Sequence, residues 1–231
     1  MKKALLLLIM AMAVWSCSND SDGPGKAQLL TKMTTTSPAD GLNFEYTLEY
    51  DSQKRLIQIV RTGDTNGIFL YYYNDKNQIS SIIAGLTDQQ TEITLNYDAN
   101  GRIASFKVGD QAPNVIAYDE DTDIYSIQNV EFSFNDNDDL DIFQSQPFSY
   151  ENDKKGPFAN VSVPIHFFSS LADPVFLLTG TRKPINSIAG VNSGDANAYD
   201  FSNTYNGDGY ITEATATGLQ EITFKYEYTD L

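Results

Sequence analysis

The residue with the most distinctive chemistry in this chain is Cys17, which is its only cysteine. It follows the basic start Lys2-Lys3 and an apolar run from Ala4 to Val14, which is too short to cross a bilayer. Such a pattern is typical of a secretory signal peptide, here residues 1–16. A thiol directly after the cut can be acylated, so we expect a lipid attached to Cys17. An ordinary signal peptide that ends beside a stray thiol is the alternative.

An acidic, flexible run from Ser18 to Gly25 follows the cysteine. It contains no residue that would build a core, so we expect residues 17–39 to form a solvated tether. Residues 40–231 are numerous enough for one large β domain, and we expect a single domain with an irregular insertion at 156–193.

The charge of the chain argues against two classes of partner. The formal net charge is −16, so nucleic acids and anionic lipid surfaces both repel this protein. Membrane attachment would therefore depend on the lipid of Cys17 alone. The only tryptophan, Trp15, lies inside the signal peptide. This counts against a carbohydrate-binding module, because flat sugar-stacking surfaces favour tryptophan.

His166 is the only histidine, so a His-rich metal site is impossible and a Ser-His-Asp triad would depend on it. It lies in the apolar stretch Val161 to Phe168, which favours a packed histidine over a catalytic base. The acidic runs at 119–123 and 136–141 lack the Gly and Glu positions of an EF-hand, so solvated turns are the default and loose calcium binding is the alternative. No spacing among the 31 acidic residues singles out a pair for glycoside hydrolysis. We expect no catalytic residue, no metal and no cofactor.

A short unit recurs between residues 44 and 107. Each copy is a strand of alternating apolar and polar residues that ends at a tyrosine followed by Asp or Asn. A turn with Asn or Gly then leads into a second strand that begins on Leu or Ile. Each unit is therefore predicted to be a β-hairpin, anchored by Tyr50, Tyr73 and Tyr97. Fainter copies follow at 130–140, 147–155 and 202–211, and a last alternating strand lies at 222–228.

Hairpins in series predict an all-β antiparallel meander of about a dozen strands, curled into a barrel or half-barrel. The clear strands are shorter than the roughly 9–11 residues that a membrane-spanning barrel needs, so we expect a soluble domain. The side chains expected to point inward are Phe44, Tyr46, Leu48, Ile93, Leu95, Phe224 and Tyr226. The insertion at 156–193 is apolar and punctuated by four prolines. It is predicted to cover a barrel mouth or hydrophobic face, or simply to add to the core.

The unit from Tyr97-Asp98 to Ile103 resembles the YD repeat of shell-forming proteins. The layout of the chain also resembles a family of Bacteroidetes lipoproteins that are described as having a porin-like fold. The matching features are the lipobox at Cys17, the Tyr-Asp hairpins at 50–51 and 97–98, the segment 155–158, and the closing motifs at 205–211 and 224–228. These motifs are structural, so no catalytic residue follows from them. The resemblance implies a lipid-anchored protein of the outer membrane, at the cell surface or on the periplasmic face. It also implies that the bound ligand could be a lipid.

The run Tyr71-Tyr72-Tyr73 cannot face one side of a strand, so at least one ring must be exposed or line a cavity. These three tyrosines, with Phe167 and Phe168 of the insertion, are the candidate ligand-binding residues. We expect non-enzymatic binding of a small or apolar ligand in an aromatic-lined interior. The alternative is a surface adhesion or interaction module that binds protein or glycan through exposed aromatics, and a less favoured third is a glycan-acting enzyme. A closed apolar cavity would favour ligand binding. An exposed aromatic patch would favour adhesion, and a polar cleft with two facing carboxylates would favour the enzyme.

Overall fold

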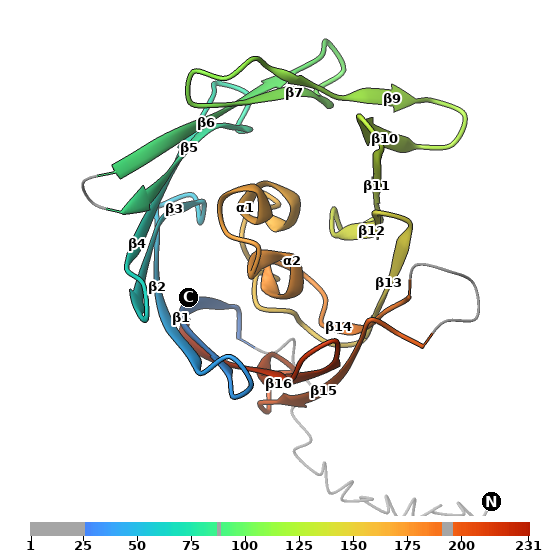
Figure 1. Ribbon diagram of the computed structural model, residues 1–231. Helices are drawn as coiled ribbons and strands as arrows, with labels where there is room; N and C mark the ends of the chain where they lie inside the picture. The colour runs from blue at the N-terminus through green and yellow to red at the C-terminus, as the bar shows by residue number, and fades with distance from the viewer. Residues whose placement is uncertain (1–25, 87–88, 191–195) are drawn as a thin grey trace, which may run out of the picture.

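The computed structural model describes residues 26–86, 89–190 and 196–231, which form an antiparallel barrel around two short helices (Figure 1). The predicted signal peptide, Cys17 and the first part of the predicted tether lie outside the described residues. No helix in the described part of the chain has the length and apolar character needed to cross a bilayer.

Each strand pairs with its neighbour in chain order, except that β8 and β9 do not pair with each other, and β17 pairs with β1, so the sheet closes on itself. Only Ile116 separates β8 from β9, which together act as one wall segment. The strands are β1 (Gln28–Ser37), β2 (Leu42–Tyr50), β3 (Leu56–Gly63), β4 (Gly67–Tyr73), β5 (Ile79–Leu86), β6 (Gln89–Tyr97), β7 (Ile103–Val108), β8 (Asn114–Val115), β9 (Ala117–Asp119), β10 (Ile124–Ile127), β11 (Val130–Phe134), β12 (Leu140–Phe143), β13 (Gln146–Tyr150), β14 (Ile185–Ile188), β15 (Tyr199–Tyr205), β16 (Ile211–Gly218) and β17 (Ile222–Asp230).

The prediction of an all-β antiparallel meander curled into a barrel is confirmed, with 17 strands rather than about a dozen. The inward-facing set is also confirmed: all seven predicted side chains are buried except Phe44, which is half-buried. The extra strands include β8, β9 and β10, which have only two to four residues and are too short to show an alternating pattern.

The predicted tether at 17–39 is wrong over its second half, because Gln28–Ser37 is β1 and closes the barrel. A bulge between Leu30 and Lys32 explains why this strand was not predicted from the sequence. The bulge brings Leu30 and Met33, three positions apart, onto the interior, where both are 0% exposed. An alternation of period two is therefore lost in this strand.

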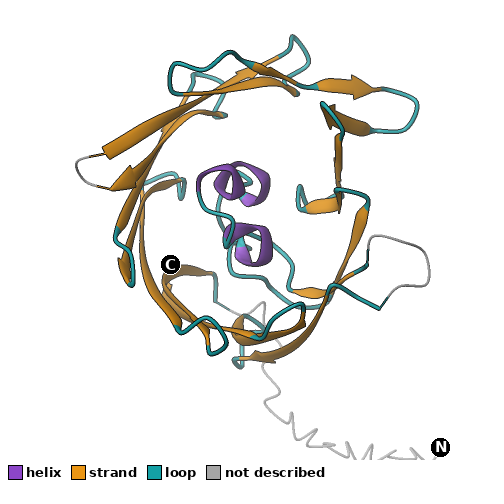
Figure 2. Cartoon of the chain, in the orientation of Figure 1, coloured by secondary structure: helices purple, strands orange, loops and turns teal. Residues whose placement is uncertain are grey.

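The predicted irregular insertion at 156–193 is wrong at its C-terminal part, where Ile185–Ile188 forms the wall strand β14. The preceding residues 156–184, which we call the plug, lie inside the barrel and carry α1 (His166–Ala172) and α2 (Phe176–Thr179) (Figure 2). Phe158, Phe167 and Phe176 of the plug are at most 2% exposed and belong to the main core cluster. The plug therefore adds to the core, which was one of the two alternatives for this segment.

Candidate ligand-binding pocket

The repeated turns share one backbone design, seen clearly in the third hairpin. The amide of Gly101 donates to the carbonyl of Asp98 at 3.1 Å, and Oδ1 of Asp98 accepts from the amides of Asn100 and Arg102 at 2.9 Å each. Gly101 has a φ of +85°, in the left-handed region where glycine is unstrained, as the turn prediction requires. The corresponding positions of other turns also have positive φ: Lys54, Asn77, Asp138 and Gly209.

Two of the anchor tyrosines, Tyr73 and Tyr97, join their hairpin to the one before it, whereas the hydroxyl of Tyr50 is buried with no hydrogen-bond partner among the described residues. The hydroxyl of Tyr73 donates to the carbonyl of Leu56 at 2.7 Å, and that of Tyr97 donates to the carbonyl of Ile79 at 2.8 Å. Leu56 and Ile79 are the first residues of β3 and β5, directly after the preceding turns. Burial raises the pKa of both tyrosines, so both hydroxyls keep their protons and act as donors. These bonds align the repeated turns along one end of the barrel, which we call the turn end.

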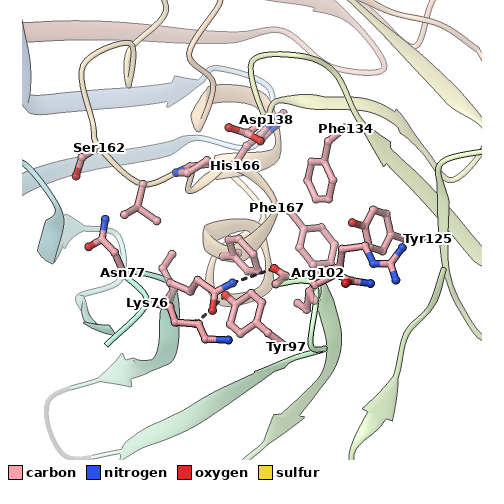
Figure 3. Close-up of a pocket in the computed structure, with 18 residues that line it drawn as sticks. Lys76, Asn77, Tyr97, Arg102, Tyr125, Phe134, Asp138, Ser162, His166 and Phe167 are labelled. Carbon is pink, nitrogen blue, oxygen red and sulfur yellow. Dashed lines mark hydrogen bonds between the residues drawn. The ribbon is translucent and has the colours of Figure 1, made fainter. Parts of the chain in front are cut away.

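A pocket of about 330 Å³ opens at the turn end, between the turns and the plug (Figure 3). We call it the aromatic pocket, because rings from the wall and from the plug converge on it. Tyr97 and Phe168 lie 6.4 Å apart between ring centroids, and Phe134 meets Phe167 edge-on at 6.0 Å. Tyr125 of β10 packs edge-on against Phe134 at 5.6 Å. Edge-to-face packing of this kind holds rings in defined orientations and leaves an apolar surface toward the opening.

The rim of the aromatic pocket is polar. Lys76 and Ser162 are exposed there, and so is Asp138 of the turn between β11 and β12. Arg102 is held in place by Asp98, with Nε and Oδ2 2.9 Å apart. Two backbone amides and this guanidinium, with the Arg102 amide foremost, lower the pKa of Asp98. The ion pair therefore keeps one wall of the opening rigid and charged.

His166 lies beneath the pocket with both ring nitrogens occupied. Nδ1 accepts from the amide of Leu140 at 3.1 Å, and Nε2 lies 2.9 Å from the carbonyl of Leu177, so the partners assign the proton to Nε2. The side chain is 1% exposed, and burial lowers its pKa to about 4. The expectation of a packed histidine is confirmed. The ring joins the β11–β12 hairpin to the plug and has no nitrogen left to act as a base.

Asp139 joins the same hairpin to the other end of the plug. Its carboxylate accepts from the amide of Arg182 at 2.7 Å and from that of Lys183 at 2.9 Å. It is 1% exposed, and burial raises its pKa to about 6. The expectation that 136–141 is a solvated turn is therefore wrong at Asp139. Across residues 26–86, 89–190 and 196–231 there is no group of three or more His, Cys, Asp or Glu side chains placed to hold a metal ion.

Of the five residues predicted to bind ligand, Phe167 and Phe168 line the aromatic pocket. The three tyrosines lie elsewhere. Tyr71 is buried against the plug, with its hydroxyl 2.9 Å from a serine hydroxyl of α1, and Tyr73 is the hairpin anchor described above. Tyr72 is 47% exposed, which confirms that the three rings cannot face one way.

The pocket residues that sequence reasoning missed are Tyr97, Tyr125 and Phe134. A signal for two of them was available. Tyr97 and Phe134 occupy the same place in the repeat, directly before Asp98 and Asn135 respectively. Each is the last residue of its strand, so both lie at the turn end of the barrel. Tyr125 follows no repeat and could be found only from the tertiary structure.

Comparisons with known proteins agree with the repeated hairpins. A family model described as the teneurin YD-shell matches residues 25–153, more than half of the chain. Among solved structures, the crystal structure of a porin-like protein from Bacteroides uniformis aligns with a TM-score of 0.43 and 12% sequence identity, and the alignment covers 87% of this chain and 98% of that one. No curated protein matches the chain.

Proposed function

The chain belongs to the teneurin YD-shell family, and we propose that it is a non-enzymatic binding protein that takes a small, largely apolar ligand in the aromatic pocket. One observation carries the proposal. Rings from three wall strands and from the plug converge on a pocket that has a polar rim and is open at the turn end, in place of the closed cavity expected from the sequence. Small-molecule sites have this composition, with apolar walls and a few polar groups that orient the ligand.

The size of the pocket fits a small molecule. Its volume of about 330 Å³ lies at the lower end of the roughly 300–1,000 Å³ of ligand sites. An apolar ligand body would contact Tyr97, Phe134 and Phe168, and a polar group would reach Lys76 at the rim. The ligand therefore combines a compact apolar part with at least one polar group.

A surface adhesion module is less well supported. Binding through exposed aromatics needs several of them together. In the part of the chain that the structure describes, Tyr72 is the one aromatic among the large exposed hydrophobic residues. A glycan hydrolase uses two facing carboxylates. The aromatic pocket presents one acidic side chain among its described lining residues, Asp138.

The same proposal includes the location of the protein. Export by the signal peptide and a lipid on Cys17 would hold the barrel at the outer membrane, on the cell surface or the periplasmic face. Lipid attachment of this kind leaves the wall strands free to face water, and the polar outer residues Glu45, Glu49 and Glu92 suit such a face.

The proposal is tested by blocking the pocket without touching the core. Ser162 is exposed at the rim, so Ser162→Phe fills the opening with a ring. The matched control is Ser202→Phe, at an exposed position of β15 on the barrel wall. Native mass spectrometry of proteins purified from cells should detect a bound small molecule on the wild type and on Ser202→Phe, and not on Ser162→Phe.

The fluorescent probe N-phenyl-1-naphthylamine gives a second readout that needs no knowledge of the natural ligand. It should bind the wild type and Ser202→Phe with equal affinity and bind Ser162→Phe at least roughly tenfold more weakly. A probe that binds all three proteins equally, together with no co-purifying molecule, would refute ligand binding in this pocket.

A further inference from the structure

A second cleft, of about 400 Å³, opens at the end of the barrel opposite the turns. We call it the far cleft. Its described lining residues are all different from those of the aromatic pocket. Most of its surface is apolar, and Leu42 at its edge is 41% exposed. The apolar walls come from β2, β17 and the region of α2, and include Phe44, Val175, Leu177, Leu178 and Ile222.

An ion pair between half-buried Arg61 and buried Asp173 forms the polar part of the far cleft. Nη1 of Arg61 lies 2.8 Å from Oδ2 of Asp173, and the hydroxyl of Tyr46 donates to the same oxygen at 3.2 Å. Oδ1 of Asp173 accepts from the amide of Val175 at 3.1 Å. The guanidinium also lies over the ring of Phe44, 5.2 Å from its centroid. These contacts fix Arg61 and satisfy the carboxylate from within the protein.

Two polar groups at the far cleft have no partner of their own. Thr35 of β1 is 6% exposed, and its hydroxyl makes no hydrogen bond to any described residue. Nε of Arg61 is likewise buried without a partner among them. Both side chains line the far cleft, and Arg61 also borders a neighbouring cleft of about 310 Å³. Buried polar groups are normally hydrogen-bonded, so two unpaired ones at the same cleft indicate a ligand that supplies the missing bonds.

The charges around the far cleft select against an anion. Arg61 is already neutralised by Asp173, and a second carboxylate lies beside the lining residue Ser37, whose hydroxyl donates to Asp40 at 3.1 Å. A carboxylate or phosphate head would therefore approach two negative groups and one compensated cation. A hydroxyl or carbonyl group can accept from the same donors without that repulsion.

We propose that the far cleft binds an uncharged apolar molecule that carries a single hydroxyl or carbonyl group. The apolar part packs against Phe44, Leu178 and Ile222, and the polar group meets Thr35 and Arg61. This site is separate from the aromatic pocket and does not depend on the function proposed for that pocket.

Isothermal titration calorimetry with two ligands of equal chain length tests the proposal. At pH 7.5, 1-octanol should bind the wild-type protein with at least roughly tenfold higher affinity than octanoate, because octanoate carries the excluded charge. Thr35→Val removes the unpaired hydroxyl at constant shape and should weaken octanol binding roughly fivefold. Thr36→Val is the matched control, because Thr36 is the next residue of β1 and is exposed. It should leave octanol binding unchanged.

Octanoate binding as tightly as octanol, equal effects of the two threonine variants, or no saturable octanol binding would each overturn the proposal. The comparison of the two ligands uses the unaltered protein, so it remains decisive even if Thr35→Val fails to fold. Ser162→Phe, which blocks the aromatic pocket, should leave octanol binding intact. Loss of octanol binding in that variant would place the alcohol in the aromatic pocket instead and refute the far cleft as its site.

Discussion

The hydroxyl of Tyr97 reaches back across one hairpin to the carbonyl of Ile79, 2.8 Å away. A bulge between Asn96 and Tyr97 precedes this contact and turns the tyrosine toward the preceding turn. Tyr228 makes the same contact with Ile211 at the end of the chain, at 2.7 Å. The pair Tyr97-Asp98 therefore has two functions: Asp98 closes its own turn, and Tyr97 joins that turn to the one before, a bond that the buried hydroxyl of Tyr50 does not make.

Removing this hydroxyl should destabilise the barrel. Tyr97→Phe leaves the carbonyl of Ile79 without its partner, so we expect a loss of about 1 kcal/mol in the free energy of unfolding, measured by urea denaturation. Tyr72→Phe is the control, because Tyr72 is 47% exposed, and it should change stability by no more than a few tenths of that amount. Equal losses in the two variants would contradict the structural role of the Tyr97 hydroxyl.

The turn glycine provides a second test of the repeat. Gly101→Val places a β-branched residue at a φ of +85° and should cost about 1–2 kcal/mol of stability. Ala99→Val, two residues earlier in the same turn at an exposed position, should cost less. Thermal and urea unfolding of both variants measure the difference. If Ala99→Val were as destabilising as Gly101→Val, backbone strain at Gly101 would not be the cause.

Stability should depend on pH through His166. Burial lowers its pKa from 6.5 to about 4, so the unfolded chain takes up a proton at this residue before the folded protein does. The contribution of the neutral ring to stability is therefore present above pH 6.5 and is lost as the pH falls toward 4. At roughly 1.4 kcal/mol per pKa unit, the loss is on the order of 3 kcal/mol.

The variant His166→Gln isolates this effect, because glutamine keeps a donor and an acceptor but does not titrate. The stability difference between wild type and His166→Gln should shrink from pH 7 to pH 4. Asp139 acts in the opposite direction, because its pKa is raised to about 6 and its protonation favours the folded state as the pH falls. Asp139 is present in both proteins, so its contribution largely cancels. A stability difference that is independent of pH would refute the assignment to His166.

Membrane attachment should depend on one atom, the sulfur of Cys17. In Cys17→Ala the lipid cannot be attached, so the protein should be found in the soluble fraction or remain as an uncleaved precursor after cell fractionation. A processed Cys17→Ala protein that still needs detergent for its extraction would show that the anchor lies elsewhere.

Without its N-terminal segment, the barrel is expected to be soluble. The chain from residue 26 onward retains all of the described strands, including β1. It should therefore remain monodisperse without detergent in size-exclusion chromatography. Its predicted inward set is buried in the barrel, which leaves no belt of those side chains to face lipid. Aggregation that detergent reverses would indicate a membrane-spanning barrel instead.

Patterns within single hairpins predicted much of the fold. The alternation in Phe44 to Tyr50 and in Ile93 to Tyr97 predicted strands and their buried faces correctly, because the two sides of a strand differ in solvent exposure and the sequence records that difference directly. The positive φ at Gly101 followed from turn chemistry for the same local reason. The strand β1 was missed because its bulge at Leu30/Lys32 disrupts this pattern.

The candidate site depended more heavily on contacts between distant residues. The apolar insertion gave Phe167 and Phe168 as candidate ligand-binding aromatics, but the sequence does not contain the position of the plug inside the barrel. That position is set by bonds such as Asp139 to the amides of Arg182 and Lys183, more than 40 residues away in sequence. The wall residues of the aromatic pocket could therefore not be read from sequence spacing.

The sequence by itself determined the repeated hairpin, its Tyr-Asp anchor, the antiparallel meander and the unique cysteine. Each of these features depends only on residues that are close together in the chain. Tertiary structure alone decided that β17 pairs with β1, that the plug fills the interior, and that separate clefts remain at the two ends of the barrel. The physical reason is closure: once the ring of strands is complete, the space inside must be filled, and which rings and charges meet there depends on packing across the whole barrel.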